Sequence, residues 1–325
     1  MLDSTKKSKA LWVAGIFFVV VLSVPVAIGV IYNQTNQNIT NQVAARQQTL
    51  VNLTATAVKV KIDHLVGLAE SIASVGSITQ DVASNHWSDA ARTVGDLQNN
   101  VAFYDPFVDR VIFYNVAGIQ QAAYPTLVGG IGSSATSSSW YHVLSQGGGS
   151  YVSGVARRLS MPQINVVSVA VPIKSGGAIK GFLVLQIPTN NFLEFGTDLS
   201  LGTYGFSYIV DAKGSLVAHP QFSSQNGAVV DYSFMPAVKD VMAGVSGTII
   251  TYDPSESEKS VVMFEPLPQY GWGIVVQELY DEMFAARDSI LFSYKIEMII
   301  VFLIDILLSY LIYRLLTGGL IRKKI

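Results

Sequence analysis

The sequence predicts an α+β protein in which two tandem antiparallel-sheet units sit on a long N-terminal helix and are flanked by two transmembrane helices. Three observations predict this fold. Long apolar runs occupy residues 10–32 and 290–316. A helical hydrophobic period follows the first run. Between the runs, the order of strand, glycine-containing turn, strand and proline occurs twice.

The repeated pattern is clearest at residues 208–220. An apolar run enters a turn that contains Asp211 and Gly214, and a second apolar run ends before Pro220. Aspartate can hydrogen-bond its own backbone to start a turn, and glycine takes a positive φ at no steric cost. Proline donates nothing to a strand ladder and therefore ends the second strand. Residues 108–125 show the same order, so we expect two copies of one unit.

The composition excludes several classes of protein. The chain has 325 residues, 50% hydrophobic and 14% charged, with a net charge of −2. A net charge of −2 gives no overall positive potential that would attract nucleic acid. Without cysteine there are no disulfides, no thiolate catalysis and no cysteine-zinc sites. The four histidines lie too far apart in sequence to form a metal-spaced pair, so we expect no metal and no cofactor.

Residues 10–32 form the first apolar run, which contains no charge. About 20 such residues span a bilayer as a helix. Lysines precede the run and none follows closely, which places the N-terminus in the cytoplasm. The alternative is a cleaved signal peptide, which the length of the run and the lack of a clean cleavage site disfavour.

The second apolar run, residues 290–316, contains Lys295, Glu297 and Asp305. A carboxylate near the middle of a span is costly. We interpret Asp305 as a polar contact between neighbouring helices, with a signalling or ion site as the alternative. Basic residues at both chain ends predict a two-pass protein of the cell membrane, with residues from about 33 to 289 outside the cytoplasm.

Between the spans, a helical period covers residues 33–73 and a second helical stretch covers 82–97. Strand-like runs at 108–114, 165–173 and 178–187 predict an antiparallel meander with helices packed on one side. A second unit follows, with a short helix near 235–242 and strands at 248–252, 260–267 and 272–278. The predicted segments are a cytoplasmic N-terminus (1–9), a first transmembrane helix (10–32), a stalk helix and second helix (33–102), a membrane-distal unit (103–189), a membrane-proximal unit (190–280), a helix into the second transmembrane helix (281–316) and a cytoplasmic tail (317–325).

This order resembles the extracytoplasmic double Cache sensors, which are PAS-like, of prokaryotic chemoreceptors, sensor kinases and cyclases. The resemblance covers about residues 43–288. It rests on short segments in a fixed order: Val111–Gly118, Trp140-Tyr141, Val169–Ile173, Gly181–Ile187, Asp211–Gly214 with His219-Pro220, and Trp272–Val276. The resemblance implies that the membrane-distal unit binds a small extracellular ligand.

A frequent amine-recognising version of that family has Arg-x-Trp-Tyr, then Tyr-x-Asp, then a further Asp. This chain keeps Trp140, Tyr141 and Tyr151, but has Ser138, Ser153 and Gln186 at the charged positions. We therefore expect a neutral or weakly anionic ligand rather than an α-amino acid. The candidate ligand-binding residues are Trp140, Tyr141, Tyr151, Ser153, Arg157 (or Arg158), Gln186 and Tyr124.

Several of these residues also have a purely structural interpretation. Trp140 and Tyr141 are equally well explained as core aromatics, and the pair Arg157-Arg158 is more often solvated than an anion clamp. Asp211 is interpreted as a turn residue, and His219 as the end of a strand.

The predicted function is a transmembrane signal-transduction receptor, of the chemotaxis or two-component type, that acts as a homodimer in the lipid bilayer. No catalytic motif occurs, so we expect no enzyme activity in this chain. Little sequence follows Leu316, so the output is expected in a partner or in a module outside this chain. The alternatives are a structural or adhesive surface module and a solute-binding accessory of a transporter.

Overall fold

The computed structural model describes residues 2–98, 104–126, 129–158, 160–197, 205–222, 227–252 and 259–321, without the side chains of 2–11, 13–22, 196–197, 309 and 313–321. The basic residues Arg322, Lys323 and Lys324, on which part of the topology prediction rests, lie outside the described residues. The chain divides into two compact units: Met1–Arg46 with Asp281–Ile325, and Gln47–Tyr280.

The first unit consists of the start of helix α1 (Leu2–Ala73) and of helix α7 (Tyr280–Ile321). Arg287 Nη1 of α7 lies 3.4 Å from Thr40 Oγ1 of α1. In the described part of the chain, no helix is both long enough and apolar enough to cross a membrane. Asp305 Oδ2 is buried and has no hydrogen-bond partner among the described residues, so its proposed helix–helix contact stays a prediction.

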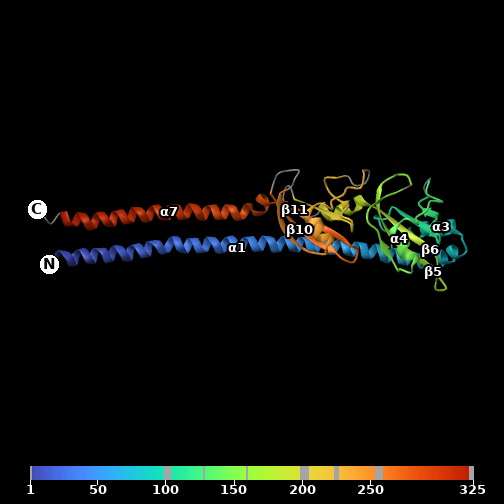
Figure 1. The fold of residues 1–325 in the computed structure, drawn as a ribbon, viewed down its shortest axis with the longest axis horizontal. Coiled ribbons are helices and arrows are strands. Elements are labelled where there is room, and N and C mark those ends of the chain that lie inside the picture. Colours follow the sequence, from blue (N-terminus) through green and yellow to red (C-terminus); the bar gives the residue numbers. More distant parts are fainter. Residues whose placement is uncertain are drawn as a thin grey trace. The chain divides into compact units, whose positions relative to one another are not determined.

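The second unit begins with the C-terminal part of α1, followed by α2 (Gly76–Ala83) and α3 (Trp87–Gln98), and contains two antiparallel sheets (Figure 1). The first sheet has the order β2-β1-β6-β5-β3, and β4 also pairs with β5. Its elements are β1 (Arg110–Asn115), β2 (Gln120–Tyr124), α4 (Ser139–Ser145), β3 (Tyr151–Val152), β4 (Ala156–Arg157), β5 (Asn165–Ser175) and β6 (Ala178–Pro188).

The predicted meander is wrong in its strand order. Strand β6 lies between β5, its hairpin partner, and β1, the first strand of the unit. The residues Gly181–Leu185 of β6 are buried, so both edges of this strand need partners for their backbone groups. Pairing with β1 satisfies the second edge, which an open meander would leave exposed.

The second sheet repeats this arrangement with the order β8-β7-β11-β10-β9. The short helices η2 (Thr189–Leu193) and α5 (Glu194–Thr197) precede it. Its elements are β7 (Phe206–Val210), β8 (Leu216–Ala218), α6 (Pro236–Met242), β9 (Gly247–Tyr252), β10 (Lys259–Leu267) and β11 (Trp272–Leu279). The predicted α+β architecture, with two antiparallel sheets after a long N-terminal helix, is confirmed.

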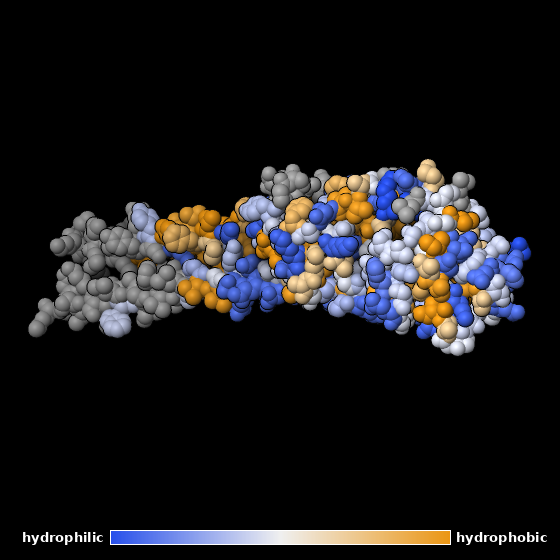
Figure 2. Space-filling view, turned by 45° about the vertical axis from the view of Figure 1, so that its right-hand side comes forward, coloured by the Kyte–Doolittle hydropathy of each residue, from blue (hydrophilic) through white to orange (hydrophobic). Residues whose placement is uncertain are grey.

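Alternation along the strands separates two faces of the first sheet. Odd-numbered residues such as Val111, Phe113 and Leu185 pack with α1–α3 in the main core, which also includes Trp272 of the second sheet. Even-numbered residues such as Ile112 and Val184 pack in a separate cluster with α4. We call the α4-covered face of the first sheet the first outer face. The corresponding surface of the second sheet packs against α6 and is called the second outer face. On the exterior, hydrophobic and hydrophilic residues are interspersed over the side shown in Figure 2.

The predicted turn at Asp211 is confirmed, and it also connects the two sheets. Asp211 Oδ1 accepts hydrogen bonds from the backbone N–H groups of Lys213 and Ser215, both at 2.9 Å. Its second oxygen, Oδ2, accepts the N–H of Val155 in the β3–β4 loop at 2.9 Å. A Cβ atom on Gly154 would lie 2.4 Å from Asp211 Oδ2, so only glycine fits beside this carboxylate. His219 is buried after β8, with aromatic rings around it, as expected of a structural residue.

Candidate functional site

The first outer face is organised in rows that cross the strands. The register places Tyr114 opposite Phe182 in one row. The next row contains Ile112, Val184 and Ala170, and the row after it contains Arg110, Gln186 and Ser168. The face therefore changes from aromatic to aliphatic to polar along the strands, which gives it one end for an apolar group and one for a polar group.

The aromatic end is packed closely by α4. Trp140 is 5% exposed, and its ring centroid lies 5.0 Å from that of Tyr114 and 5.8 Å from that of Phe182. The Tyr141 hydroxyl donates to the Val116 carbonyl at 3.1 Å. Burial raises the pKa of Tyr114 to about 12, so this phenol stays protonated. Trp140 thus has the packing of a core residue.

The polar row continues to Ser153, the residue that follows β3. Ser153 Oγ accepts the backbone N–H of Ser168 at 2.9 Å and donates to the Gly154 carbonyl at 2.7 Å. Gln186 Oε1 is buried and has no hydrogen-bond partner among the described residues. Arg110, the first residue of β1, completes the row and is 3% exposed.

A second buried arginine lies close to Arg110. Arg158 is 3% exposed, and its Nη1 atom is 2.7 Å from Asp109 Oδ2. Arg110 Nη1 donates to Ser160 Oγ at 2.8 Å, and its Nη2 atom is 3.8 Å from the same oxygen of Asp109. Burial, and then the neighbouring charge of Arg158, lower the pKa of Arg110 to about 10, so the Arg110 guanidinium is charged at neutral pH.

The structure brings together five of the predicted ligand residues. Trp140, Tyr141 and Tyr151 pack on the first outer face, and Ser153 and Gln186 belong to its polar row.

The other two predicted residues lie elsewhere. Arg157 is exposed and donates from Nη1 to the Gly227 carbonyl at 2.9 Å. Tyr124 packs on the helix-side core, where a Cβ on Gly95 of α3 would lie 2.6 Å from its ring.

Sequence reasoning missed Arg110 and named Arg158 only as an alternative to Arg157. The interpretation of Arg157-Arg158 as a solvated pair is wrong for Arg158, because pairing of the β4 segment with β5 turns consecutive side chains to different environments. The position of Arg110 could have been predicted from strand alternation, because residues 110, 112 and 114 point to the same face of a strand whose two faces are both buried.

The second outer face contains a small cavity of about 110 Å³. Its lining is apolar apart from two phenols, one aliphatic hydroxyl and one amide: Tyr208, Met235, Pro236, Ala237, Ile249, Thr251, Tyr252, Val262 and Gln277. No lysine, arginine, aspartate or glutamate is among these described lining residues, so the cavity suits packing or a small uncharged molecule.

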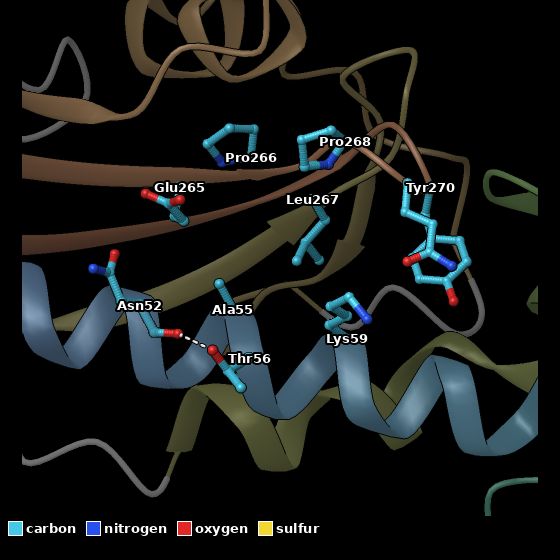
Figure 3. A pocket seen from close by; sticks show the side chains of 10 residues that line it. Asn52, Ala55, Thr56, Lys59, Glu265, Pro266, Leu267, Pro268 and Tyr270 are labelled. Carbon is cyan, nitrogen blue, oxygen red and sulfur yellow. Dashed lines mark hydrogen bonds between the residues drawn. The ribbon is translucent and has the colours of Figure 1, made fainter.

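A groove of about 350 Å³ runs between α1 and the β10–β11 turn (Figure 3). Asn52, Thr56 and Lys59 on the helix face the segment from Glu265 to Tyr270. Lys59 pairs with Asp63 at 2.6 Å, and the Tyr270 hydroxyl donates to the same carboxylate. The groove presents charges of both signs, and they do not converge on one chemical group.

Comparison with known proteins identifies the fold. The family model of the Cache domain matches residues 31–287. No curated protein matches this chain.

Among solved structures, similarity extends to the ligand-binding domain of the Pseudomonas fluorescens chemoreceptor CtaA in complex with L-isoleucine. The TM-score is 0.56 and the identity 16%, over 77% of this chain and 98% of that one. The ligand-binding domain of the Pseudomonas aeruginosa amino acid chemoreceptor PctB with L-Arg has a TM-score of 0.56 at 15% identity, over 75% and 98%. The periplasmic sensory domain of the Campylobacter jejuni chemoreceptor Tlp1 has a TM-score of 0.56 at 12% identity, over 76% and 98%. The family match is continuous, and it covers two antiparallel sheets with the same strand order that follow one long helix. This chain therefore belongs to the double Cache family of sensor domains.

Proposed function

We propose that this chain is the extracytoplasmic sensor of a membrane receptor, of the chemotaxis or two-component type. A small molecule binds on the first outer face, and the resulting change passes through the second sheet to α7. The observation that carries this proposal is the graded first outer face, in which a buried polar row adjoins aliphatic and aromatic rows. Ligand sites typically combine an apolar lining with a few placed polar groups.

Two similar structures support ligand sensing, because they contain the ligand-binding domains of the chemoreceptors CtaA and PctB in complex with amino acids. The polar row of this chain has no acid that could hold an ammonium group, since its described members are Arg110, Gln186, Ser168 and Ser153. An α-amino acid held by carboxylates is therefore not the ligand that we propose.

Anchoring in the membrane is the second part of the proposal. It is supported by the two apolar runs of the sequence. The exposed side chains of α7 between residues 290 and 311 are mostly large and hydrophobic, as in Phe302, Leu303 and Leu307, each more than half exposed. Apolar surface all round a helix suits a lipid environment or an oligomer. We further propose a homodimer with both termini in the cytoplasm, and no catalysis by this chain.

Ligand binding is tested by thermal melting of the full chain in lipid nanodiscs against a library of small metabolites. A true ligand at 100 times its Kd stabilises the protein by about 2.7 kcal/mol. The variant Tyr151→Ala, on the first outer face, should abolish the shift. Tyr124→Ala is the matched control, because it removes a half-buried tyrosine from the other face of the same sheet. A shift that survives Tyr151→Ala but not Tyr124→Ala would refute the proposed site.

Signalling is tested by disulfide cross-linking between two copies through a single cysteine in α7, at Ala285→Cys. A ligand that binds a receptor changes the cross-linking rate. An unchanged rate with saturating ligand would instead favour an adhesive module or a solute-capturing accessory.

The absence of cysteine allows a clean topology test. Single cysteines at the exposed positions Gln146 and Lys213 should react with a membrane-impermeant maleimide in intact cells. Cysteines at Ser4 and Lys323 should react only after permeabilisation. The reverse pattern would refute the proposed orientation.

A further inference from the structure

We propose that Arg110 and Arg158 form a binding site for the carboxylate of a small organic monoanion, at the polar end of the first outer face. This inference rests on the proposed function, because it names the ligand class for the same site.

The charge balance of this cluster favours an anion. Both arginine side chains are almost completely buried, at 4% and 1% exposed, whereas Asp109, the one carboxylate that pairs with them among the described residues, is 40% exposed. Two guanidiniums and one carboxylate leave one positive charge inside the protein. A buried charge without a partner is costly, and two like charges close together add to this cost. One negative charge from a ligand would neutralise the cluster.

The hydrogen-bond donors of the two arginines are only partly used. The Nε atom of Arg110 and the Nε and Nη2 atoms of Arg158 are buried and have no hydrogen-bond partner among the described residues. Within 3.0 Å, Ser160 contacts one nitrogen of Arg110 and Asp109 contacts one nitrogen of Arg158. Guanidinium presents a planar fork of donors that matches a carboxylate, and such charge-assisted bonds are about twice as strong as neutral ones.

The rows beside the arginines indicate the rest of the ligand. The polar row adjoins the row of Ile112, Val184 and Ala170, beyond which lie Tyr114 and Phe182. The small residues Ala170 and Ser168 occupy the β5 positions of these rows. A ligand that places its carboxylate at the arginines would direct its other end toward apolar side chains. The geometry thus favours an aliphatic or aromatic monocarboxylate over phosphate, which is more highly charged and has no apolar part.

The test is calorimetric titration of the full chain in nanodiscs with benzoate and hexanoate, with benzamide and phosphate as comparison probes. We expect the monocarboxylates to bind and the other two to bind at least 10-fold more weakly. Arg158→Lys keeps the charge but loses the planar fork, so benzoate affinity should fall at least 10-fold, which corresponds to about 1.4 kcal/mol. Arg157→Lys, an exposed neighbour of the same type, is the matched control and should change affinity less than 2-fold.

The second variant, Asp109→Asn, should change benzoate affinity in the opposite direction. Removal of the competing carboxylate should tighten benzoate binding several-fold while it lowers the melting temperature of the ligand-free protein, a combination that a purely structural salt bridge would not produce. Equal affinity for benzoate and benzamide, or unchanged benzoate affinity in Arg158→Lys, would overturn the carboxylate site.

These outcomes separate the carboxylate site from the proposed function. If a neutral metabolite binds and changes the α7 cross-linking rate, the carboxylate site is wrong and the sensor function stands. If benzoate binds through the arginines without any effect on that rate, the site stands and the signalling function is wrong.

Discussion

The two sheets have the same strand order, but their outer faces carry different chemistry. In the first sheet the row at the start of β1 contains Arg110, Gln186 and Ser168. The row at the equivalent start of β7 contains Phe206, Gln277 and Val262. Glutamine occupies the same place in both rows, while the arginine is replaced by phenylalanine and the serine by valine.

This difference shows that the fold does not determine which sheet has a ligand site. Each outer face is covered by one short helix, α4 or α6. Only the first has buried guanidiniums among its described residues, and the second encloses a cavity of about 110 Å³ without lysine, arginine, aspartate or glutamate in its lining. Both sheets share one strand order, and the different residues in one row determine the chemistry of each outer face.

The largest expected effect comes from placing a charge on the second outer face. Val262 is 3% exposed, so Val262→Arg would bury a guanidinium without an acid to pair with. An uncompensated buried charge costs about 3–5 kcal/mol of folding free energy. Urea unfolding followed by circular dichroism should show this loss.

Ile250→Arg is the control on the same sheet, because Ile250 is 56% exposed, and it should change stability by less than about 0.5 kcal/mol. If Val262→Arg were as stable as the wild-type chain, the two outer faces would not differ as described.

The next effect concerns the connection between the sheets. Asp211→Asn keeps one oxygen for the turn but replaces the other by an amide that cannot accept the Val155 N–H. An unsatisfied buried backbone donor costs about 1–3 kcal/mol. Unfolding measurements should show this loss, together with weaker transfer of a ligand signal to α7. Asp231→Asn, in a comparable turn at the surface, should have a smaller effect. Equal effects in both variants would show that Asp211 acts only within its own turn.

Much of this architecture was predictable from the sequence, because each hairpin is encoded locally. Asp211 and Gly214 mark one turn, and Gly118 marks the other, where φ is +74° and a Cβ would lie 2.8 Å from the Tyr141 ring. The strand order was not predictable in this way, since β1 and β6 pair across more than 60 residues and no local pattern records that pairing.

The candidate site was predictable only in part. Aromatic and small polar residues such as Trp140, Tyr151 and Ser153 stood out by their order, whereas Arg158 was named only as an alternative to Arg157. Its burial depends on the pairing of β4 with β5 and on the position of Asp109, both of which are tertiary features. Arg110 was predictable in principle, from the parity of its strand.

A smaller effect follows from adding one side-chain group to each outer face. Ala237 lines the small cavity of the second face, so Ala237→Val should fill space and stabilise the protein by about 0.5–1 kcal/mol. Ala170→Val adds the same two methyl groups beside the polar row of the first face, where ligand binding should weaken. Thermal melting with and without benzoate separates these outcomes. Loss of ligand binding in Ala237→Val instead would move the site to the second sheet.

The smallest effect is a pH dependence that involves two acids at the groove of Figure 3. Glu265 lines the groove, and Asp63 contacts two of its lining residues, Lys59 and Tyr270. The pKa values of these two acids shift in opposite directions. Hydrogen bonds from Lys59 and Tyr270 lower the pKa of Asp63 below its ordinary value, so its contribution to stability is present at neutral pH and is lost as the pH falls through the folded-state pKa. Burial raises the pKa of Glu265 above its ordinary value, so its ionised form opposes folding at neutral pH and this cost disappears on acidification. Glu265→Gln should therefore stabilise the protein at pH 7 by less than about 1 kcal/mol, since partial exposure screens the charge. Melting temperatures between pH 3 and 7 should show the variant and the wild-type chain converging at the acidic end, and a constant difference across this range would show that the Glu265 charge is not the cause.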